Sequence, residues 1–580
     1  MTDSSNPSAE ADAVSDSVNH LLRERHPIRT GAAASVGAGL LLQACGGGSN
    51  ASADTSAAAP QSSSGPGGAQ NLAITDTSAS RFLAQASMGA SRAEIASVKA
   101  LGYTGWVNAQ FAMPLTPTRL DALRSGGFDA LGNRNTENGF DAAVWRKMLS
   151  SPDTLRQRVT LALSEITVAA IDGMIGGGWK AFAAAAYFDL LEANAFGNYR
   201  TLLGQLSTSA PMGEYLTFRG NLKYNAATGA LPDENYAREI MQLFSIGLVQ
   251  LNMDGTPKVV NGVAQDTYGL DDITGLARVF TGWDFDLAGK DTSTPDFLQR
   301  PMIQIASRHE TGASTFLSTT IPAGLNGADS LKAALDWIFA HPNVAPFISR
   351  QLIQKLVTSN PSAAYVSRVA AVFKNDGAGV SGNLQAVIAA ILLDQEARQP
   401  DLSGTAYGKL REPILRFSGW ARAYNATSAG NAWNIGDTSD PASRLGQSPG
   451  RAPSVFNFFR PGYVPPNSGV ASAGLVAPEF QITNESSVVG YVNFMQRAIS
   501  TGIGDVKADY SSLLPLADNA QNLVSELNTV LAAGQISGPN LTQIAAAVDG
   551  MQKGTDPARL NRIFAALTLV LAAPEFIVQK

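Results

Sequence analysis

The chain has 580 residues, of which 45% are hydrophobic and 16% charged, and its formal net charge is −6. This composition suits a large buried core, and the absence of a Lys/Arg-rich stripe argues against nucleic-acid binding. With four histidines and one cysteine, the chain cannot form a cysteine-rich zinc site or an intrachain disulfide.

The first 45 residues have the layout of an export signal. Three arginines precede an apolar, Ala/Gly-rich run, residues 31–42, that is too short to span a bilayer as an ordinary transmembrane helix. The Leu-Gln-Ala-Cys run that ends at Cys45 resembles a bacterial lipobox, which predicts lipidation of Cys45 and a membrane anchor. The alternative is an ordinary signal that is cut elsewhere and leaves a free thiol.

The localisation predicted by this signal is the cell envelope. A long n-region favours Tat export, but no adjacent arginine pair is present, so the Tat and Sec routes both stay open. Gly46 follows the cysteine in place of aspartate, which by resemblance to Gram-negative sorting rules favours an outer-membrane over a periplasmic lipoprotein. Residues 46–76 are rich in Gly, Ser and Ala and predict a flexible tether.

Residues 77–580 carry apolar residues at helical spacing without an internal linker. We therefore expect a mainly α-helical fold, a single large multi-helix domain that is either compact or bilobed. Between residues 249 and 317 an Asp-Gly pair separates two short apolar runs, which indicates a minor β-hairpin element. A further helix is predicted at residues 407–424, starting with Lys409, Arg411 and Glu412.

A helix that starts near Ser151 places Arg158 and Glu165 on one face, two turns apart. One interpretation is a salt bridge, either solvated or between helices. The other is a catalytic role for Glu165, in which this carboxylate converges with other acids on one site.

Residues 231–247 form the most informative stretch of the chain. Pro232 and Asp233 predict the start of a helix and Gly247 its end. One face of this helix is apolar, and Glu234 and Arg238 lie opposite it at the spacing of a surface ion pair.

Glu239 lies at the edge of the buried face of the same helix, with Asn235 one turn before it. A carboxylate there must find donors or a cation, or stay protonated. Glu239 is therefore a candidate catalytic residue, and Asn235, Glu234, Arg238 and Arg158 are candidate binding residues.

His309 lies in a turn between two short strand-like runs, beside Glu310. A histidine next to an acid suits a metal ligand or a general base, and the alternative is a structural histidine. We take His309 as a catalytic candidate, Glu310 as a binding candidate, and Glu239 with His309 as the candidate metal ligands.

Residues 233–247 resemble the signature of the bacterial family called domain of unknown function 1800. Six further segments resemble the family in the same order, so the resemblance extends from about Thr77 to the C-terminus. It implies a mostly helical, exported protein, often encoded beside a Tat-exported, sulfatase-like protein, and it brings no established activity. The family has a histidine followed by an acid, usually Asp, where this chain has Glu310. The six segments are residues 81–87, 155–166, 277–283, 341–353, 454–466 and 573–579.

Two classes of function remain open. The first is a non-catalytic envelope protein, a binding, assembly or maturation partner of the sulfatase-like protein; it predicts Glu239 and Arg158 in structural pairs without a shared polar pocket. The second is an enzyme in which Glu165, Glu239 and His309 converge, with or without Glu234, for metal-assisted hydrolysis or acid–base cleavage of a glycan outside the cytoplasm. It predicts a concave polar site with perturbed carboxylates. The sequence specifies no cofactor, and the absence of a complete catalytic motif favours the first class.

Overall fold

The computed structural model describes residues 73–402, 404 and 406–580, and these residues form one compact unit. The predicted signal with Cys45, and all but the last residues of the predicted tether, lie outside the described residues. The first described helix, α2 (Asp76–Ala86), starts directly after Thr75. The Thr75 hydroxyl accepts a hydrogen bond from the Ser78 backbone amide and caps the helix.

The fold is mainly α-helical, as the sequence predicts. The described residues contain 22 α-helices and only short two-stranded sheets. Within this part of the chain, no helix combines the length and the apolar character that a membrane crossing needs.

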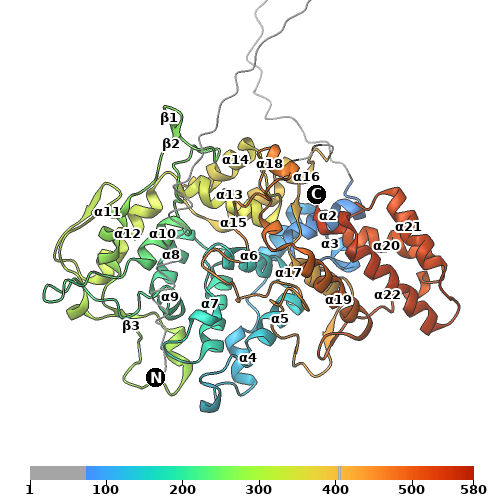
Figure 1. Ribbon diagram of the computed structural model, residues 1–580, viewed down its shortest axis with the longest axis horizontal. Coiled ribbons are helices and arrows are strands. Elements are labelled where there is room, and N and C mark those ends of the chain that lie inside the picture. The colour runs from blue at the N-terminus through green and yellow to red at the C-terminus, as the bar shows by residue number, and fades with distance from the viewer. Residues whose placement is uncertain (1–72, 403, 405) are drawn as a thin grey trace, which may run out of the picture. The chain divides into compact units, whose positions relative to one another are not determined.

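Helix α6 (Thr154–Ser164) lies in the middle of the compact unit (Figure 1). Ten of its 11 residues are buried. It packs against helices from both halves of the sequence: α3 (Arg92–Phe111), α5 (Phe140–Ser150), α7 (Lys180–Asn194) and α13 (Val344–Leu356). Because a helix buried on every side must satisfy its polar side chains internally, α6 is the place to look for buried charge.

Two groups of helices flank this centre (Figure 1). A single hydrophobic core runs through both of them. One group contains α8 (Tyr199–Thr208), α9 (Ala210–Tyr215), α10 (Asn235–Gln242), α11 (Leu270–Ala277) and α12 (Gly327–Ala340). The other contains α2, α19 (Glu485–Thr501), α20 (Ala520–Ala532), α21 (Gly538–Asp549) and α22 (Asp556–Ala572).

The predicted turn at the Asp-Gly pair is present, and a second hairpin follows it along the chain. Strands β1 (Val259–Val260) and β2 (Val263–Ala264) pair antiparallel around Asn261 and Gly262, both of which have positive φ. Asn-Gly is the preferred pair for such a two-residue turn. The Asp-Gly pair ending at Gly255 makes a separate turn that closes the single bridge between Leu251 and Pro257. In Figure 1 the β1–β2 hairpin projects away from the helices.

Two predicted helices are shorter than expected. Helix α10 begins at Asn235 and ends at Gln242. Beyond it the backbone hydrogen bonds span more residues than in an α-helix, since the Ile246 and Gly247 amides both donate to the Met241 carbonyl. The helix predicted at residues 407–424 begins only at its proline, as α17 (Pro413–Ala423). The residues before it form strand β7 (Lys409–Leu410), which pairs with β10 (Val578–Gln579) near the C-terminus.

Candidate functional site

Six charged side chains gather at the carboxyl end of α6, and each of them is at most 8% exposed. Charged groups are rarely buried unless they are paired, because the loss of hydration must be offset by ion pairs and hydrogen bonds between them. We refer to these residues as the buried charge cluster. Its members are Arg158, Glu165, Lys355, Lys409, Glu412 and Glu479.

The carboxyl end of α13 binds two cations of this cluster. Arg158 Nη2 donates to the Lys355 carbonyl at 2.5 Å, and Lys409 Nζ donates to the carbonyls of Gln354 at 3.1 Å and Lys355 at 2.8 Å. The last carbonyls of a helix have no intrahelical donors and carry the negative end of its dipole, so they stabilise both cations. Lys409 Nζ also lies 3.1 Å from Glu479 Oε1.

Glu165 is the residue directly after α6, at the negative end of its dipole. Its Oε2 lies 3.0 Å from Lys355 Nζ, which in turn lies 4.2 Å from the centre of the Phe459 ring. Burial raises the pKa of the Glu165 carboxyl, and the neighbouring Glu412 carboxylate raises it further, while Lys355 opposes the shift. Glu165 is therefore the carboxyl of the pair that holds a proton.

Glu412 occupies the opposite kind of position, directly before Pro413 at the amino end of α17. Burial alone would raise its pKa, but the adjacent Glu165 carboxyl and the charge of Lys409 outweigh burial, and the pKa of Glu412 is lowered. Gln447 Nε2 donates to Glu412 Oε2 at 2.8 Å, and Gln447 Oε1 accepts from the Ile414 amide at 3.2 Å. Glu412 is therefore the ionised member of the pair.

A small pocket lies beside Glu165. Its space of about 20 Å³ is enough for one water molecule. Gln447, Ser448 and Asn457 contribute polar groups to its wall, and Phe188 and Phe458 contribute aromatic rings. Asn457 Nδ2 is buried and forms no hydrogen bond within the described chain, so a donor remains free at this wall.

Glu239 lies away from this cluster, on α10. It is 6% exposed, and its Oε2 has no hydrogen-bond partner among the described residues. Burial raises its pKa to about 7, with Arg238 opposing the shift. Its negative charge raises the pKa of two nearby phenols, Tyr215 and Tyr268, in addition to the effect of their burial.

The polar neighbours of Glu239 on the same helix are engaged in local contacts. Glu234 and Arg238 form the ion pair that their spacing predicts, with 3.5 Å between Oε2 and Nη2, and Glu234 Oε1 accepts from Thr274 at 2.7 Å. The Asn235 amide donates to Asp233 Oδ1 at 2.8 Å. These contacts shape the start of α10 and leave Glu239 as its one buried acid.

His309 is 2% exposed, and both of its ring nitrogens are in contact with hydrogen-bonding atoms. Nδ1 lies 3.0 Å from the Thr281 carbonyl, and Nε2 lies 3.4 Å from Ser330 Oγ. Glu310 accepts from the Gly312 amide at 3.0 Å and lies 3.5 Å from Arg278. These contacts match the structural interpretation of His309.

The structure joins some of the predicted site residues and not others. Arg158 and Glu165 both contact Lys355. The Arg158 guanidinium donates to the Lys355 backbone carbonyl, and the Glu165 carboxyl lies beside the Lys355 ammonium. The contacts of Glu239 and His309 have no residue in common with each other or with this pair. Within the described residues, no group of three or more His, Cys, Asp or Glu side chains is placed to hold a metal ion.

The family model described as "Protein of unknown function (DUF1800)" matches residues 81–578, nearly the whole chain. The chain belongs to this family. No curated protein and no solved structure matches it. Because the family's description names no activity, the function of this DUF1800 chain has to be argued from its buried charge cluster.

The sequence pointed to Arg158 and Glu165 but not to their partners. Lys355, Lys409, Glu412 and Glu479 come from segments up to about 300 residues further along, and each looks like an ordinary surface charge in its local pattern. The resemblance to DUF1800 gives one sequence signal for this site. Arg158 and Glu165 lie in the family-like segment 155–166, and the pocket residue Asn457 lies in the family-like segment 454–466.

Proposed function

We propose that the protein is a carboxylate acid–base hydrolase of the cell envelope, in which Glu165 is the proton donor and the substrate is a glycan. The observation that carries the proposal is the Glu165–Glu412 pair. Burial and the Glu412 anion raise the pKa of Glu165, so this carboxyl keeps its proton to higher pH, as a general acid must.

In the proposed reaction the glycosidic C–O bond breaks as its oxygen takes the proton of Glu165. Water in the pocket adds its hydroxyl group to the anomeric carbon, and the remaining proton of that water restores Glu165. Lys355, 3.0 Å from Oε2, offsets the carboxylate that exists between the two transfers. Glu412 acts on Glu165 and not on substrate, and is a positioning residue.

The chemical groups on the pocket wall are of the types that bind sugars. The Ser448 hydroxyl and the free Asn457 amide match sugar hydroxyls, and the partly exposed Phe458 ring matches the apolar face of a sugar. The space admits water rather than a whole sugar, so the substrate bond would approach its opening. Export and a lipid anchor at Cys45 are part of the same proposal, since they would place the enzyme among envelope glycans.

The test is the release of reducing ends from envelope polysaccharides and from chromogenic glycosides. We expect Glu165→Gln to reduce the rate by about 10²–10⁴-fold, the usual contribution of a positioned acid. Glu214→Gln is the matched control, because burial also raises the pKa of Glu214, to about 7, in a different part of the fold. Hydrolysis that is unchanged in Glu165→Gln, or no hydrolysis of any glycan by the wild type, would reject the proposal.

A second function, binding of a co-exported sulfatase-like protein, is favoured by the β1–β2 hairpin. Val259, Val260 and Val263 are 57%, 54% and 60% exposed on this projecting element. Clustered exposed valines suit a protein contact. Replacing all three with threonine should abolish co-purification of the sulfatase-like protein while glycan hydrolysis continues; retention of the partner would reject this site.

A further inference from the structure

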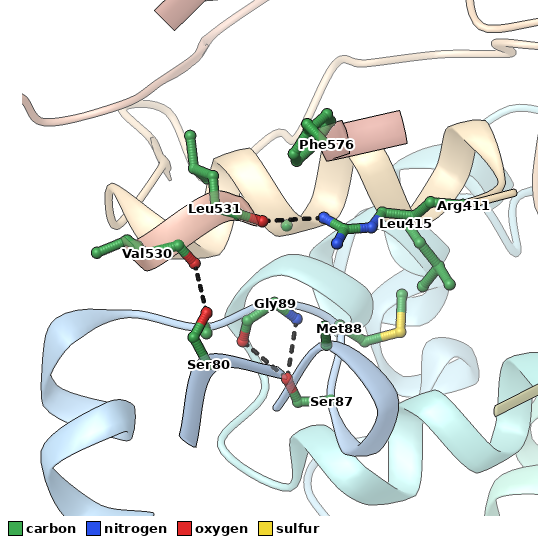
Figure 2. Close-up of a pocket in the computed structure, with 12 residues that line it drawn as sticks. Ser80, Ser87, Met88, Gly89, Arg411, Leu415, Val530, Leu531 and Phe576 are labelled. Atoms are coloured by element: carbon green, nitrogen blue, oxygen red, sulfur yellow. Dashed lines mark hydrogen bonds between the residues drawn. The ribbon is translucent and has the colours of Figure 1, made fainter. Parts of the chain in front are cut away.

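Arg411 is a buried cation with no paired carboxylate among the residues that the structure describes. It follows strand β7, is 5% exposed, and lies 4.6 Å from the centre of the Phe576 ring. Nη1 donates to the Leu531 carbonyl at 3.1 Å, as Figure 2 shows. Nε and Nη2 are buried and make no hydrogen bond within the described part of the chain.

The surroundings of Arg411 do not neutralise it. Burial lowers its pKa to about 10, with Tyr491 raising it and Arg416 lowering it further, so the guanidinium stays charged at neutral pH. Arg416 is itself a cation, and its Nε donates to the Arg411 carbonyl at 2.5 Å. The Leu531 carbonyl is in the last turn of α20 and offers only the partial charge of a helix end. No carboxylate of the described residues forms an ion pair with Arg411, and none contributes to the shift of its pKa.

A pocket lies directly beside this guanidinium (Figure 2). The turn after α2 closes it on one side, where Gly89 approaches α17 so tightly that a Cβ would stand 2.7 Å from the Gly419 Cα. The hydroxyls of Ser80 and Ser87 donate to the carbonyls of Val530 and Gly89, at 2.9 Å in both cases. The free donors at the wall are therefore those of Arg411.

The size of the pocket limits what can neutralise Arg411. Its space of about 20 Å³ holds one water-sized particle, which excludes phosphate, sulfate and a substrate carboxylate. A charged group in such a place needs a counter-charge, since an uncompensated buried ion is strongly destabilising. A single halide ion meets both requirements.

We propose that Arg411 binds one halide ion, chloride in the natural setting, in the pocket formed by the turn after α2, α17 and the end of α20. The ion neutralises the charge of Arg411 and contacts all three segments. Because it binds the folded chain and not the unfolded one, it stabilises the fold in proportion to its occupancy. This site is separate from Glu165 and stands whether or not the protein is a hydrolase.

The first experiment is a crystal of the wild-type protein grown with bromide, in which anomalous scattering locates the ion. We expect a bromide peak within about 3.5 Å of Arg411 Nη2 or Nε, the distance of a charge-assisted hydrogen bond to a halide. Bromide peaks that occur only at other places, or a water molecule in this pocket, would overturn the proposal.

The second experiment is thermal unfolding of the wild-type chain at constant ionic strength, with chloride exchanged for gluconate, which is too large for the pocket. Tm should rise by several degrees with chloride and then saturate. Arg411→Met should remove this dependence, and Arg92→Met, which changes a half-exposed surface arginine, should keep it. If gluconate stabilises as well as chloride, or if the chloride dependence survives in Arg411→Met, the ion does not bind here. Should Arg411→Met fail to fold, the gluconate comparison and the bromide map still decide.

Discussion

Glu165 and Glu412 are neighbouring buried carboxyls at opposite kinds of helix end, Glu165 directly after the last residue of α6 and Glu412 directly before the first residue of α17. The dipole of α6 disfavours negative charge on Glu165, and the dipole of α17 favours it on Glu412. The helix ends therefore act in the same direction as burial and charge, and the proton of the pair belongs to Glu165.

The first prediction contrasts the two members of the pair. Glu165→Gln replaces a neutral acid by a neutral amide of the same shape, so the free energy of unfolding at pH 7 should change by about 1 kcal/mol or less. Glu412→Gln removes an anion that faces Lys409 and Arg158, and should cost about 3–5 kcal/mol. Urea unfolding measures both. Equal losses in the two variants would contradict the assignment of the proton.

The second prediction compares the two lysines of the cluster. Lys409 pairs with Glu479, whereas Lys355 pairs with the protonated Glu165. Lys409→Met should therefore lower the free energy of unfolding by about 3–5 kcal/mol, and Lys355→Met by clearly less. Lys355→Met should also move the alkaline limb of the hydrolysis pH profile to higher pH, because Lys355 lowers the pKa of Glu165. The account fails if Lys355→Met is the more destabilising change.

The third prediction concerns the pH dependence of stability. The pKa of Glu239 is raised from 4.5 to about 7 by burial, so the folded chain holds this proton more tightly than the unfolded chain. The resulting stability is complete below pH 4.5 and is lost as pH rises through 7. Glu239→Gln should remove up to about 1.4 kcal/mol per pH unit of this slope in denaturant titrations. An identical slope in wild type and variant would show that Glu239 has a normal pKa.

The fourth prediction addresses His309. With its ring nitrogens facing the Thr281 carbonyl and Ser330, its replacement by alanine should cost about 1–3 kcal/mol of unfolding free energy through unsatisfied buried groups. Glycan hydrolysis at a temperature where the variant is folded should be unaffected. Loss of hydrolysis in a folded His309→Ala protein would restore His309 as a catalytic candidate.

The sequence predicted local features of the fold well, because these depend on neighbouring residues. Helical spacing predicted a mainly α-helical domain, and the positions of Glu234 and Arg238 predicted their ion pair. The Asp-Gly pair predicts the turn between Leu251 and Pro257, whereas the turn at Asn261 and Gly262, which joins β1 and β2, is an additional one. The start of α17 was placed too early, because a strand pairing with the C-terminal residues 578–579 is not visible in a local pattern.

The candidate site was only half predictable for the same reason. Arg158 lies on α6 and Glu165 directly follows that helix, and their spacing of seven residues suggests a shared face. Their coupling depends on Lys355 and Glu412, which are brought to the end of α6 only by packing of α13 and α17. Glu239 attracted attention at its own helix boundary, and the structure confirms its burial but gives it no catalytic neighbour among the predicted residues.

The most direct test of the account is infrared difference spectroscopy of the carboxyl groups at pH 7. Subtracting the spectrum of Glu165→Gln from that of the wild type should leave the carbonyl-stretch band of a protonated carboxylic acid. The same subtraction with Glu412→Gln should leave the band of an ionised carboxylate. A carboxylate band in the Glu165→Gln difference would contradict the central claim, because Glu165 could then not serve as the proton donor.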